Sequence, residues 1–367
     1  MSEFINTKKE IAWGDWYFRN HVLADDFNYR VHKKELSSYY QKRGFSASMM
    51  YDDYFSRFNG IHSEQYMSVD LYYFYAMPCL NRHDFKDAYS DKNLYPRLFP
   101  GMRQPICLVR NMNGMFFDAE NHVIGREDAA GLLLREGDDC IIKPTVETCN
   151  GDGVAGFRNE DKQSILGQFA SYKENFVIQR KLHSCRELQQ LNPTSLNSCR
   201  ICTYRDLSGV VHHVPENTFL RIGGPNAVKD NMSSGGGACC VYADGRVDDR
   251  VCRYKSMTMG SLSADYGAKD FVVPNFGQAV DYAKSLHDYL PYFDFIGWDI
   301  VICDDMKPSF IEFNVLPGVE AMQTTSGVVF GKWIDEVMDR VSYVRKEKKL
   351  FSVSHFRPGF DYRLAII

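Results

Sequence analysis

The sequence lacks the features that would place the chain in a membrane or in a secretory pathway. No run of 18 consecutive apolar residues occurs among its 367 residues, although hydrophobic residues make up 44% of them. The first ten residues, M-S-E-F-I-N-T-K-K-E, are polar and contain neither an apolar h-region nor a small-residue cleavage site. The sequence therefore predicts a globular protein without membrane insertion, and its length favours two or three packed subdomains.

An excess of charge of one sign is also missing. The chain has 43 Lys and Arg residues against 47 Asp and Glu residues, and its formal net charge is -4. A surface with both signs mixed gives no positive field that would attract a polyanion, so we expect no nucleic-acid partner.

The cysteines do not follow the pattern of a disulfide framework or of a zinc site. They number eleven and are scattered along the chain. Cys199 and Cys202 form a lone C-x-x-C, but in an extended segment their side chains point to opposite faces, and no second ligand pair follows at zinc-site spacing. This usage favours a reducing compartment, and we expect a cytoplasmic protein.

The first part of the chain, residues 1–90, predicts a helical region. It is rich in aromatic and charged residues, with helix-like stretches from Trp13 to His32 and around Lys33 to Arg43. No G-x-G-x-x-G follows a strand there, so a Rossmann domain is not indicated.

Residues 91–182 predict a small mixed α/β unit. The expected elements are a hairpin that turns at Asn113-Gly114, helices over 126–136 and 161–174, and the strands D-D-C-I-I-K-P and F-V-I-Q-R-K-L. Residues 183–345 predict a second unit, with strands on both sides of Ser208-Gly209, helices over 276–290 and 328–341, and a hairpin between them. Residues 346–367 form a tail. The fold class is therefore α+β.

A loop rich in glycine and serine spans residues 223–237. Such a composition inside a compact domain is typical of a mobile functional loop, and we expect it to lack fixed structure until a ligand binds. A simple flexible turn is the alternative.

The strongest chemical signal is the segment I-G-W-D-I-V-I-C-D-D-M-K-P-S-F-I-E-F-N, two apolar strands around a polar turn. If the hairpin is symmetric, Asp299 lies opposite Glu312, and Asn314 projects from the same face as Glu312. Carboxylates in an apolar hairpin are costly without a partner, and Mg²⁺ is a cation that takes such oxygen ligands together with nucleotide phosphates. The alternative is a structural network in which arginines neutralise the acids.

A second signal is the segment I-I-K-P-T-V-E-T-C-N-G-D-G-V-A-G-F. Lys143 ends a buried strand, and Gly151 and Gly153 lie in the turn that follows. Glycines let backbone N–H groups approach phosphate oxygens, and the lysine adds a positive charge. Because the G-K-[ST] ending of a P-loop is absent, an ordinary hairpin turn is the alternative.

Together these motifs resemble the ATP-grasp superfamily, whose pattern runs from a lysine strand through a glycine-rich loop and an adenine hinge strand to a late D…E-x-N hairpin. A closer resemblance is to the sugar-transfer-associated ATP-grasp family. It is carried by L-N-R-H-D-F-K-D-A-Y-S-D-K-N, N-P-T-S-L-N-S-C-R-I-C-T, V-K-D-N-M-S-S-G-G-G and the hairpin, and it extends from about Asn59 to the last helix. The resemblance implies two α+β subdomains that grip ATP, with ATP and two Mg²⁺ ions as cofactors and Mn²⁺ as a substitute.

The resemblance also implies roles for individual residues. Lys92, after Asp91, and Lys143 would contact the ATP phosphates, and Glu187 lies where a ribose-binding acid is found, although an exposed acid at a helix start is commonly just solvated. Adenine would be held along the hinge strand by Gln179, Arg180, Lys181 and Leu182.

For the reacting groups, the resemblance implies that Glu312 bridges two Mg²⁺ ions, which Asp299 and Asn314 complete. Arg200 in L-N-S-C-R-I resembles the arginine that meets the acyl phosphate, with a surface salt bridge as the alternative. Lys229 in the glycine-rich loop would approach the γ-phosphate as part of a lid.

The implied activity is that of an ADP-forming ligase, which phosphorylates a carboxylate and lets an amine or another nucleophile displace the phosphate. We expect a small-molecule carboxylate and an amine or sugar-linked substrate, a role in cell-surface polysaccharide or sugar-conjugate biosynthesis, and association with glycosyltransferases. A kinase of the same fold and a nucleotide-binding protein without turnover are the alternatives. The segment P-G-V-E-A-M-Q-T-T-S-G departs from the ligase pattern and leaves the acceptor site unassigned.

Overall fold

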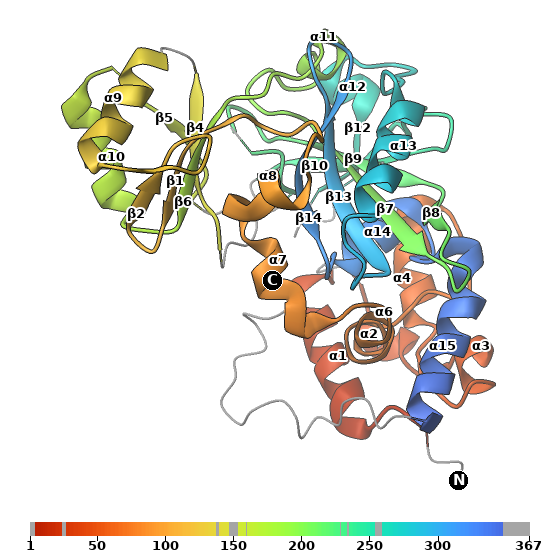
Figure 1. The fold of residues 1–367 in the computed structure, drawn as a ribbon. Helices are drawn as coiled ribbons and strands as arrows, with labels where there is room; N and C mark the ends of the chain where they lie inside the picture. The colour runs from red at the N-terminus through yellow and green to blue at the C-terminus, as the bar shows by residue number, and fades with distance from the viewer. Residues whose placement is uncertain are drawn as a thin grey trace.

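The computed structural model describes residues 4–23, 27–136, 139–146, 153–158, 160–227, 229–232, 235–253 and 259–347. Its first part is helical, as the sequence predicts (Figure 1). The elements are α1 (Lys8–His21), α2 (Tyr29–His32), α3 (Ser38–Gln41), α4 (Met50–Asn59), α5 (Val69–Leu71), the π-helix η1 (Tyr72–Ala76), α6 (Met77–Leu80), η2 (His83–Phe85), α7 (Lys86–Ser90), η3 (Lys92–Leu94) and α8 (Tyr95–Leu98).

The predicted extent of the first two helices is wrong. A capping box starts α1, because the Thr7 side chain accepts from the Glu10 N–H at 3.3 Å and the Glu10 carboxylate accepts from the Thr7 N–H at 2.7 Å. The helix ends at His21 instead of His32. Beyond it the chain turns so that Phe27 packs edge-on against Tyr54, with 5.2 Å between ring centroids, and burial of this ring overrides the helical pattern. Of the stretch from residue 33 to 43, only α3 is helical.

A six-stranded antiparallel sheet follows, in the order β3-β2-β1-β6-β4-β5. Helices α9 and α10 cover one of its faces (Figure 1). The predicted hairpin is confirmed, since Asn113 and Gly114 both have positive φ, as a tight hairpin turn requires. The elements are β1 (Cys107–Met112), β2 (Met115–Phe117), β3 (Val123–Ile124), α9 (Arg126–Glu136), β4 (Cys140–Pro144), β5 (Ala155–Phe157), α10 (Lys162–Tyr172) and β6 (Phe176–Arg180).

The second sheet has eight strands, in the order β12-β11-β10-β9-β7-β13-β14, with β8 paired to β7. The last predicted helix begins later than expected, at Ile334, and α14 was not predicted. The elements are α11 (Arg186–Gln189), β7 (Cys199–Arg205), β8 (Val211–His213), β9 (Thr218–Ile222), β10 (Gly237–Val241), β11 (Arg250–Arg253), β12 (Met259–Ser261), α12 (Leu262–Tyr266), α13 (Phe276–His287), β13 (Phe295–Ile302), β14 (Pro308–Asn314), α14 (Val319–Ser326), η5 (Gly331–Trp333) and α15 (Ile334–Glu347).

Each face of the second sheet has its own hydrophobic core. Helix α13 packs on one face, and the N-terminal helices pack on the other together with α14 and α15. Cys199 belongs to the first core and Cys202 to the second, so the two thiols of the C-x-x-C point in opposite directions, as predicted.

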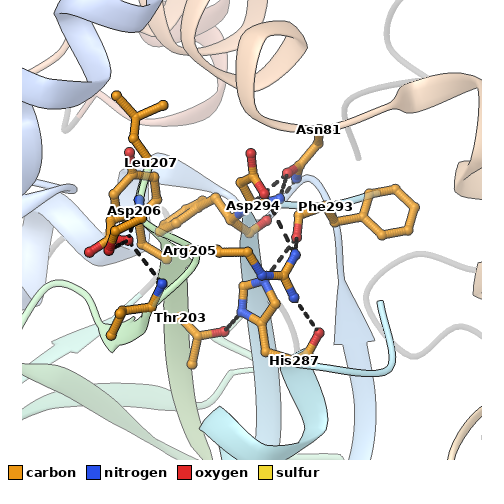
Figure 2. A network of polar contacts seen from close by, with 12 residues as sticks. Asn81, Thr203, Arg205, Asp206, Leu207, His287, Phe293 and Asp294 are labelled. Carbon is orange, nitrogen blue, oxygen red and sulfur yellow. Dashed lines mark hydrogen bonds and ion pairs between the residues drawn. The ribbon is translucent and has the colours of Figure 1, made fainter. Parts of the chain in front are cut away.

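A polar network joins the helical region to the second sheet (Figure 2). Asn81, after α6, donates from Nδ2 to the carbonyl oxygens of Phe295 at 2.7 Å and Val315 at 2.6 Å, and its Oδ1 accepts from the N–H groups of Asp294 and Phe295. Arg205 donates to the carbonyl oxygen of His287 in the same network. The helical region is thereby fixed to the start of β13 and to the residue after β14, the two strands of the D…E-x-N hairpin.

Candidate active site

The register of the β13–β14 hairpin is the one that the sequence predicts. Asp299 pairs with Glu312, and Asn314 pairs with Gly297. Asp299 is completely buried, whereas the Glu312 side chain remains 32% exposed. The three residues are therefore close in the hairpin, where Glu312 and Asn314 are partly exposed and Asp299 is fully buried.

Two arginines hold the Asp299 carboxylate. Arg200 on β7 donates to both of its oxygens, from Nε to Oδ1 and from Nη2 to Oδ2 at 3.2 Å, and Arg221 on β9 donates from Nη2 to Oδ2 at 2.8 Å. Burial alone would raise the pKa of Asp299, but the two guanidinium groups hold this pKa below its usual value. Asp299 thus lies in the arginine network that was the alternative to metal binding, and its role as a metal ligand stays a prediction.

Arg221 is the residue of the site that sequence reasoning missed. Besides Asp299 it contacts Asp230, with 3.4 Å between Nη2 and Oδ1, and it donates to Ser198 Oγ at 2.8 Å and to Asn231 Oδ1 at 3.2 Å. Burial would lower the pKa of Arg221, but the neighbouring acids raise it above the usual range. A signal for it exists in the sequence: it is the only charged residue in the buried strand T-F-L-R-I.

Two lysines from different segments converge on Glu312. Lys92 Nζ, from η3, lies 3.5 Å from Glu312 Oε2. Lys143 is buried on β4, on the face of the six-stranded sheet opposite to Ile142 and the helices. Burial and then the charge of Lys92 lower the pKa of Lys143 to about 8, against the opposing effect of Glu312. A bound anion would offset the cost of burying the positive charge of Lys143. The ATP phosphates are the anions predicted to contact this lysine.

The hinge segment leaves a backbone donor available. The N–H groups of Arg180 and Lys181 donate to the carbonyl oxygens of Ile106 at 2.9 Å and Asp139 at 2.8 Å. Within the described ranges, the Leu182 N–H donates to no carbonyl or side-chain oxygen. The Leu182 N–H is therefore available for the predicted backbone contact to adenine. That contact stays a prediction.

The remaining residues predicted for the nucleotide have different surroundings. Gln179 is buried in β6, and Glu187 is exposed in the first turn of α11. Gly153 has a φ of 75°, and a Cβ atom there would lie 2.6 Å from Pro144 Cγ, so this glycine is required by local packing. Gly151 lies outside the described residues.

Described residues of the glycine-rich loop make hydrogen bonds to neighbouring segments, and the expectation that the loop lacks fixed structure until a ligand binds stays a prediction. Asn192 Nδ2 donates to the carbonyl oxygens of Gly223 at 2.8 Å and Gly224 at 2.7 Å, and Asp230 accepts from the N–H of Ser198 at 2.7 Å. Lys229 is partly buried next to Asp230, and its role as a lid residue stays a prediction.

The side-chain oxygen atoms of Glu312 and Asn314 are suitable ligands for a magnesium ion. Asn314 Nδ2 is buried, and no described residue accepts a hydrogen bond from it, so the amide nitrogen has no protein acceptor in the described part of the chain. Its amide oxygen and the Glu312 carboxylate are the oxygen ligands that Mg²⁺ prefers. Asp299 fits less well as a direct ligand, because both of its oxygens already accept from arginine.

Comparison with known proteins identifies this fold as ATP-grasp. The model of the family described as sugar-transfer associated ATP-grasp matches residues 91–337, more than half of the chain. The chain belongs to this family. No curated protein matches the chain.

No helix in the described part of the chain is both long and apolar enough to span a bilayer.

Several solved structures are similar. They include D-cycloserine synthetase DcsG, at 11% identity over 71% of this chain and 73% of that chain with a TM-score of 0.43, and the D-alanine–D-alanine ligase from Bacillus anthracis, at 14% over 71% and 69% with a TM-score of 0.39. The ATP-grasp ligase PsnB in complex with a minimal precursor has 12% identity over 69% of this chain and a TM-score of 0.40. The chain spans 61% of the length of PsnB.

Proposed function

We propose that this protein is an ATP- and Mg²⁺-dependent ligase that forms an acyl phosphate on a carboxylate and transfers the acyl group to an amine. The observation that carries the proposal is the convergence of Lys92 and Lys143 on Glu312, from three separate segments of the chain. A buried and a largely covered lysine beside a partly exposed acid suit a triphosphate with its magnesium ions.

Each group has a part in this proposal. ATP supplies the phosphoryl group, and Mg²⁺ neutralises charge on the phosphates. Lys92 and Lys143 hold the phosphates, and Glu312 and Asn314 hold the ions, of which we expect two, with Mn²⁺ as a substitute. The hinge from Gln179 to Leu182 contacts adenine.

The arginine pair faces the reacting carboxylate. Arg200 and Arg221 carry positive charge next to the hairpin, and Asp299 orients both guanidinium groups through the contacts described above. Charges fixed in position before the reaction stabilise the developing negative charge of an acyl phosphate without reorganisation. Lys229 closes over the γ-phosphate from the adjoining loop.

The family description, sugar-transfer associated, supports a substrate linked to a sugar. We therefore propose a role in polysaccharide or sugar-conjugate biosynthesis in the cytoplasm, alongside glycosyltransferases. A kinase that phosphorylates a hydroxyl group is the second candidate, since the same nucleotide site would serve it.

The test is a pairwise screen for ADP release in the presence of Mg²⁺, with uronic acids, nucleotide sugars and amino acids as substrates. Hydroxylamine is added in a parallel series, because it traps an acyl phosphate as a hydroxamate. A ligase gives ADP and hydroxamate from a carboxylate, and the Lys143→Ala variant gives neither. ADP release that depends on a hydroxyl compound and yields no hydroxamate would support the kinase instead.

A further inference from the structure

Two polar segments of the second unit have only a small part in the site described so far. One is N-P-T-S-L-N-S, residues 192–198, which leads into β7, and the other is the glycine-rich loop, residues 223–237, between β9 and β10. Four polar residues of the first segment are buried: Asn192, Ser195, Asn197 and Ser198. Buried polar side chains normally have hydrogen-bond partners, and the partners of these residues indicate what the segment does.

The 192–198 segment binds the beginning of the glycine-rich loop. Besides the two bonds that Asn192 donates to Gly223 and Gly224, Asn197 Oδ1 accepts from the Gly223 N–H at 3.2 Å. Thr194 Oγ1 donates to the carbonyl oxygen of residue 227 at 2.8 Å. Backbone groups at the start of the loop are thus bonded to side chains of the segment that leads into β7.

Two glycines let the middle of the loop lie close to both of its ends. A Cβ atom at Gly223 would lie 2.9 Å from the carbonyl oxygen of Lys229, and a Cβ atom at Gly236 would lie 2.8 Å from that of Asn231. A side chain at either glycine would push this part of the backbone away. Asp230, between the two contacts, is therefore held next to β9 and is buried.

Asp230 connects the loop with Ser198 and Arg221. Its Oδ2 atom accepts from the N–H of Ser198 at 2.7 Å and from the Ser198 hydroxyl at 2.5 Å, and its Oδ1 atom lies 3.4 Å from Arg221 Nη2. Ser198 Oγ accepts from the same Nη2 at 2.8 Å, and the Arg221 N–H donates to the Ser198 carbonyl oxygen at 2.8 Å. The three residues form a closed ring of contacts, and all three are buried.

Arg221 is the residue at which the loop meets the metal hairpin. Asp299 of β13 accepts from its Nη2 at 2.8 Å, and Asn231 of the loop accepts from its Nη1 at 3.2 Å. Both terminal nitrogens are therefore held, and a planar guanidinium group held at both of them cannot rotate without breaking a contact. The loop supplies Asn231 and Asp230, so the orientation of Arg221 depends on where the loop lies.

We propose that Asp230 is a positioning residue of the ligase: by binding Ser198 and Arg221 together, it fixes Arg221 in the orientation that faces the acyl phosphate when the glycine-rich loop lies on β9. This inference rests on the proposed function. Asp230 acts through Arg221, and its carboxylate is neither an acid nor a base in the reaction. The loop that carries Lys229 to the γ-phosphate and the arginine that faces the reacting carboxylate are thereby linked.

The first variant is Asp230→Asn, which keeps the size of the side chain and an oxygen that accepts from Ser198, but removes the charge next to Arg221. The assay measures hydroxamate formation from the carboxylate of the screen with ATP, Mg²⁺ and hydroxylamine. We expect kcat to fall at least about tenfold, because a misplaced group near the reacting atoms can cost about 10²-fold. The KM values for ATP and the carboxylate should stay within about twofold, since the contact matters mainly in the transition state.

Asp206→Asn is the matched control. Asp206 Oδ1 also accepts from the N–H and the hydroxyl of a serine, Ser208, at 2.9 and 2.7 Å, but it lies in the turn between β7 and β8, and its ion pair is with His212. This control should keep the kcat of the wild type. Ser198→Ala is a second variant, which removes the hydroxyl group between Asp230 and Arg221 and keeps the backbone contact. It should lower kcat as well, and circular dichroism checks the folding of every variant.

A double-mutant cycle with Arg221→Lys separates positioning from a general effect on the loop. Lysine keeps the charge but has one terminal nitrogen, so it cannot be held at two positions as the guanidinium group is. We expect Arg221→Lys alone to lower kcat at least about tenfold. In that background Asp230→Asn and Ser198→Ala should each change kcat by less than about twofold, because the residue through which they act is already altered.

The outcomes distinguish this inference from the proposed function. Hydroxamate formation by Asp230→Asn at the rate of the Asp206→Asn control would overturn the positioning role and leave the ligase intact. A loss of kcat by the same factor with arginine and with lysine at position 221 would overturn it as well, since Asp230 would then act on the loop without Arg221. If the wild type forms hydroxamate with no carboxylate of the screen, the proposed function fails, and the positioning role fails with it.

Discussion

Replacing Asp299 with asparagine should strongly destabilise the protein while it preserves the shape of the side chain. The substitution leaves Arg200 and Arg221 as charged groups without their shared acid, at a position that is completely buried. Removal of one partner from a buried ion pair costs about 3–5 kcal/mol, mainly because the remaining charge is left desolvated. Since domains are stable by only about 5–15 kcal/mol, this is a large fraction of the free energy of unfolding.

Urea unfolding followed by circular dichroism measures this loss as a lower transition midpoint. Asp305→Asn is the matched control, since it makes the same change at the turn of the same hairpin, where Asp305 pairs with Arg103 at 2.5 Å and both side chains are exposed. An exposed pair contributes little, so this control should unfold with the wild type. Equal midpoints for the two variants would refute the reasoning about the buried arginine pair.

The same substitution has a defined pH dependence. The pKa of Asp299 is held below its usual value in the folded protein, so its stabilising effect is fully present above the unfolded pKa of about 3.9 and is lost as the pH falls through the lower folded pKa. The difference between wild type and Asp299→Asn should therefore be constant from pH 8 to 5 and shrink only in more acidic solution. A difference that shrinks already between pH 7 and 5 would contradict this assignment.

The remaining predictions concern turnover and nucleotide binding. Glu312→Gln and Asn314→Ala should each lower turnover at least about 10²-fold without loss of folding, and full activity in either variant would reject the metal assignment. EDTA should abolish ADP release, and Mg²⁺ or Mn²⁺ but not Zn²⁺ should restore it, because the ligands are oxygen atoms. ATP should raise the melting temperature of the wild type, and this rise should be smaller in Lys92→Ala and Lys143→Ala; an unchanged rise would reject the phosphate contacts. Lys229→Ala should lower kcat more than it weakens ATP binding, and a change in neither quantity would leave the loop without a role.

The hairpin could be predicted from sequence because its geometry is local. A polar turn between two apolar strands fixes which residues face each other, and the pairing of Asp299 with Glu312 follows from counting. The partners of Asp299 could not be found in this way, since Arg200 and Arg221 come from strands about 80 to 100 residues earlier in the chain. Their contact depends on the strand order of the second sheet, which no local pattern determines.

In the N-terminal region, the sequence predicts the helical character but not the ends of the helices. Its helical character follows from composition and period, but its boundaries depend on tertiary burial, as at Phe27, where a ring turns into the core and ends the helical pattern.

The most direct test of the ligase account follows one oxygen atom through the reaction. The carboxylate identified in the pairwise screen is enriched with oxygen-18 in its carboxyl group and is converted with ATP, Mg²⁺ and methylamine, and the released phosphate is analysed by mass spectrometry. Formation of an acyl phosphate transfers one labelled oxygen to the inorganic phosphate, and this is the result we predict. Unlabelled phosphate, released while the labelled carboxylate is converted to the amide, would contradict the account.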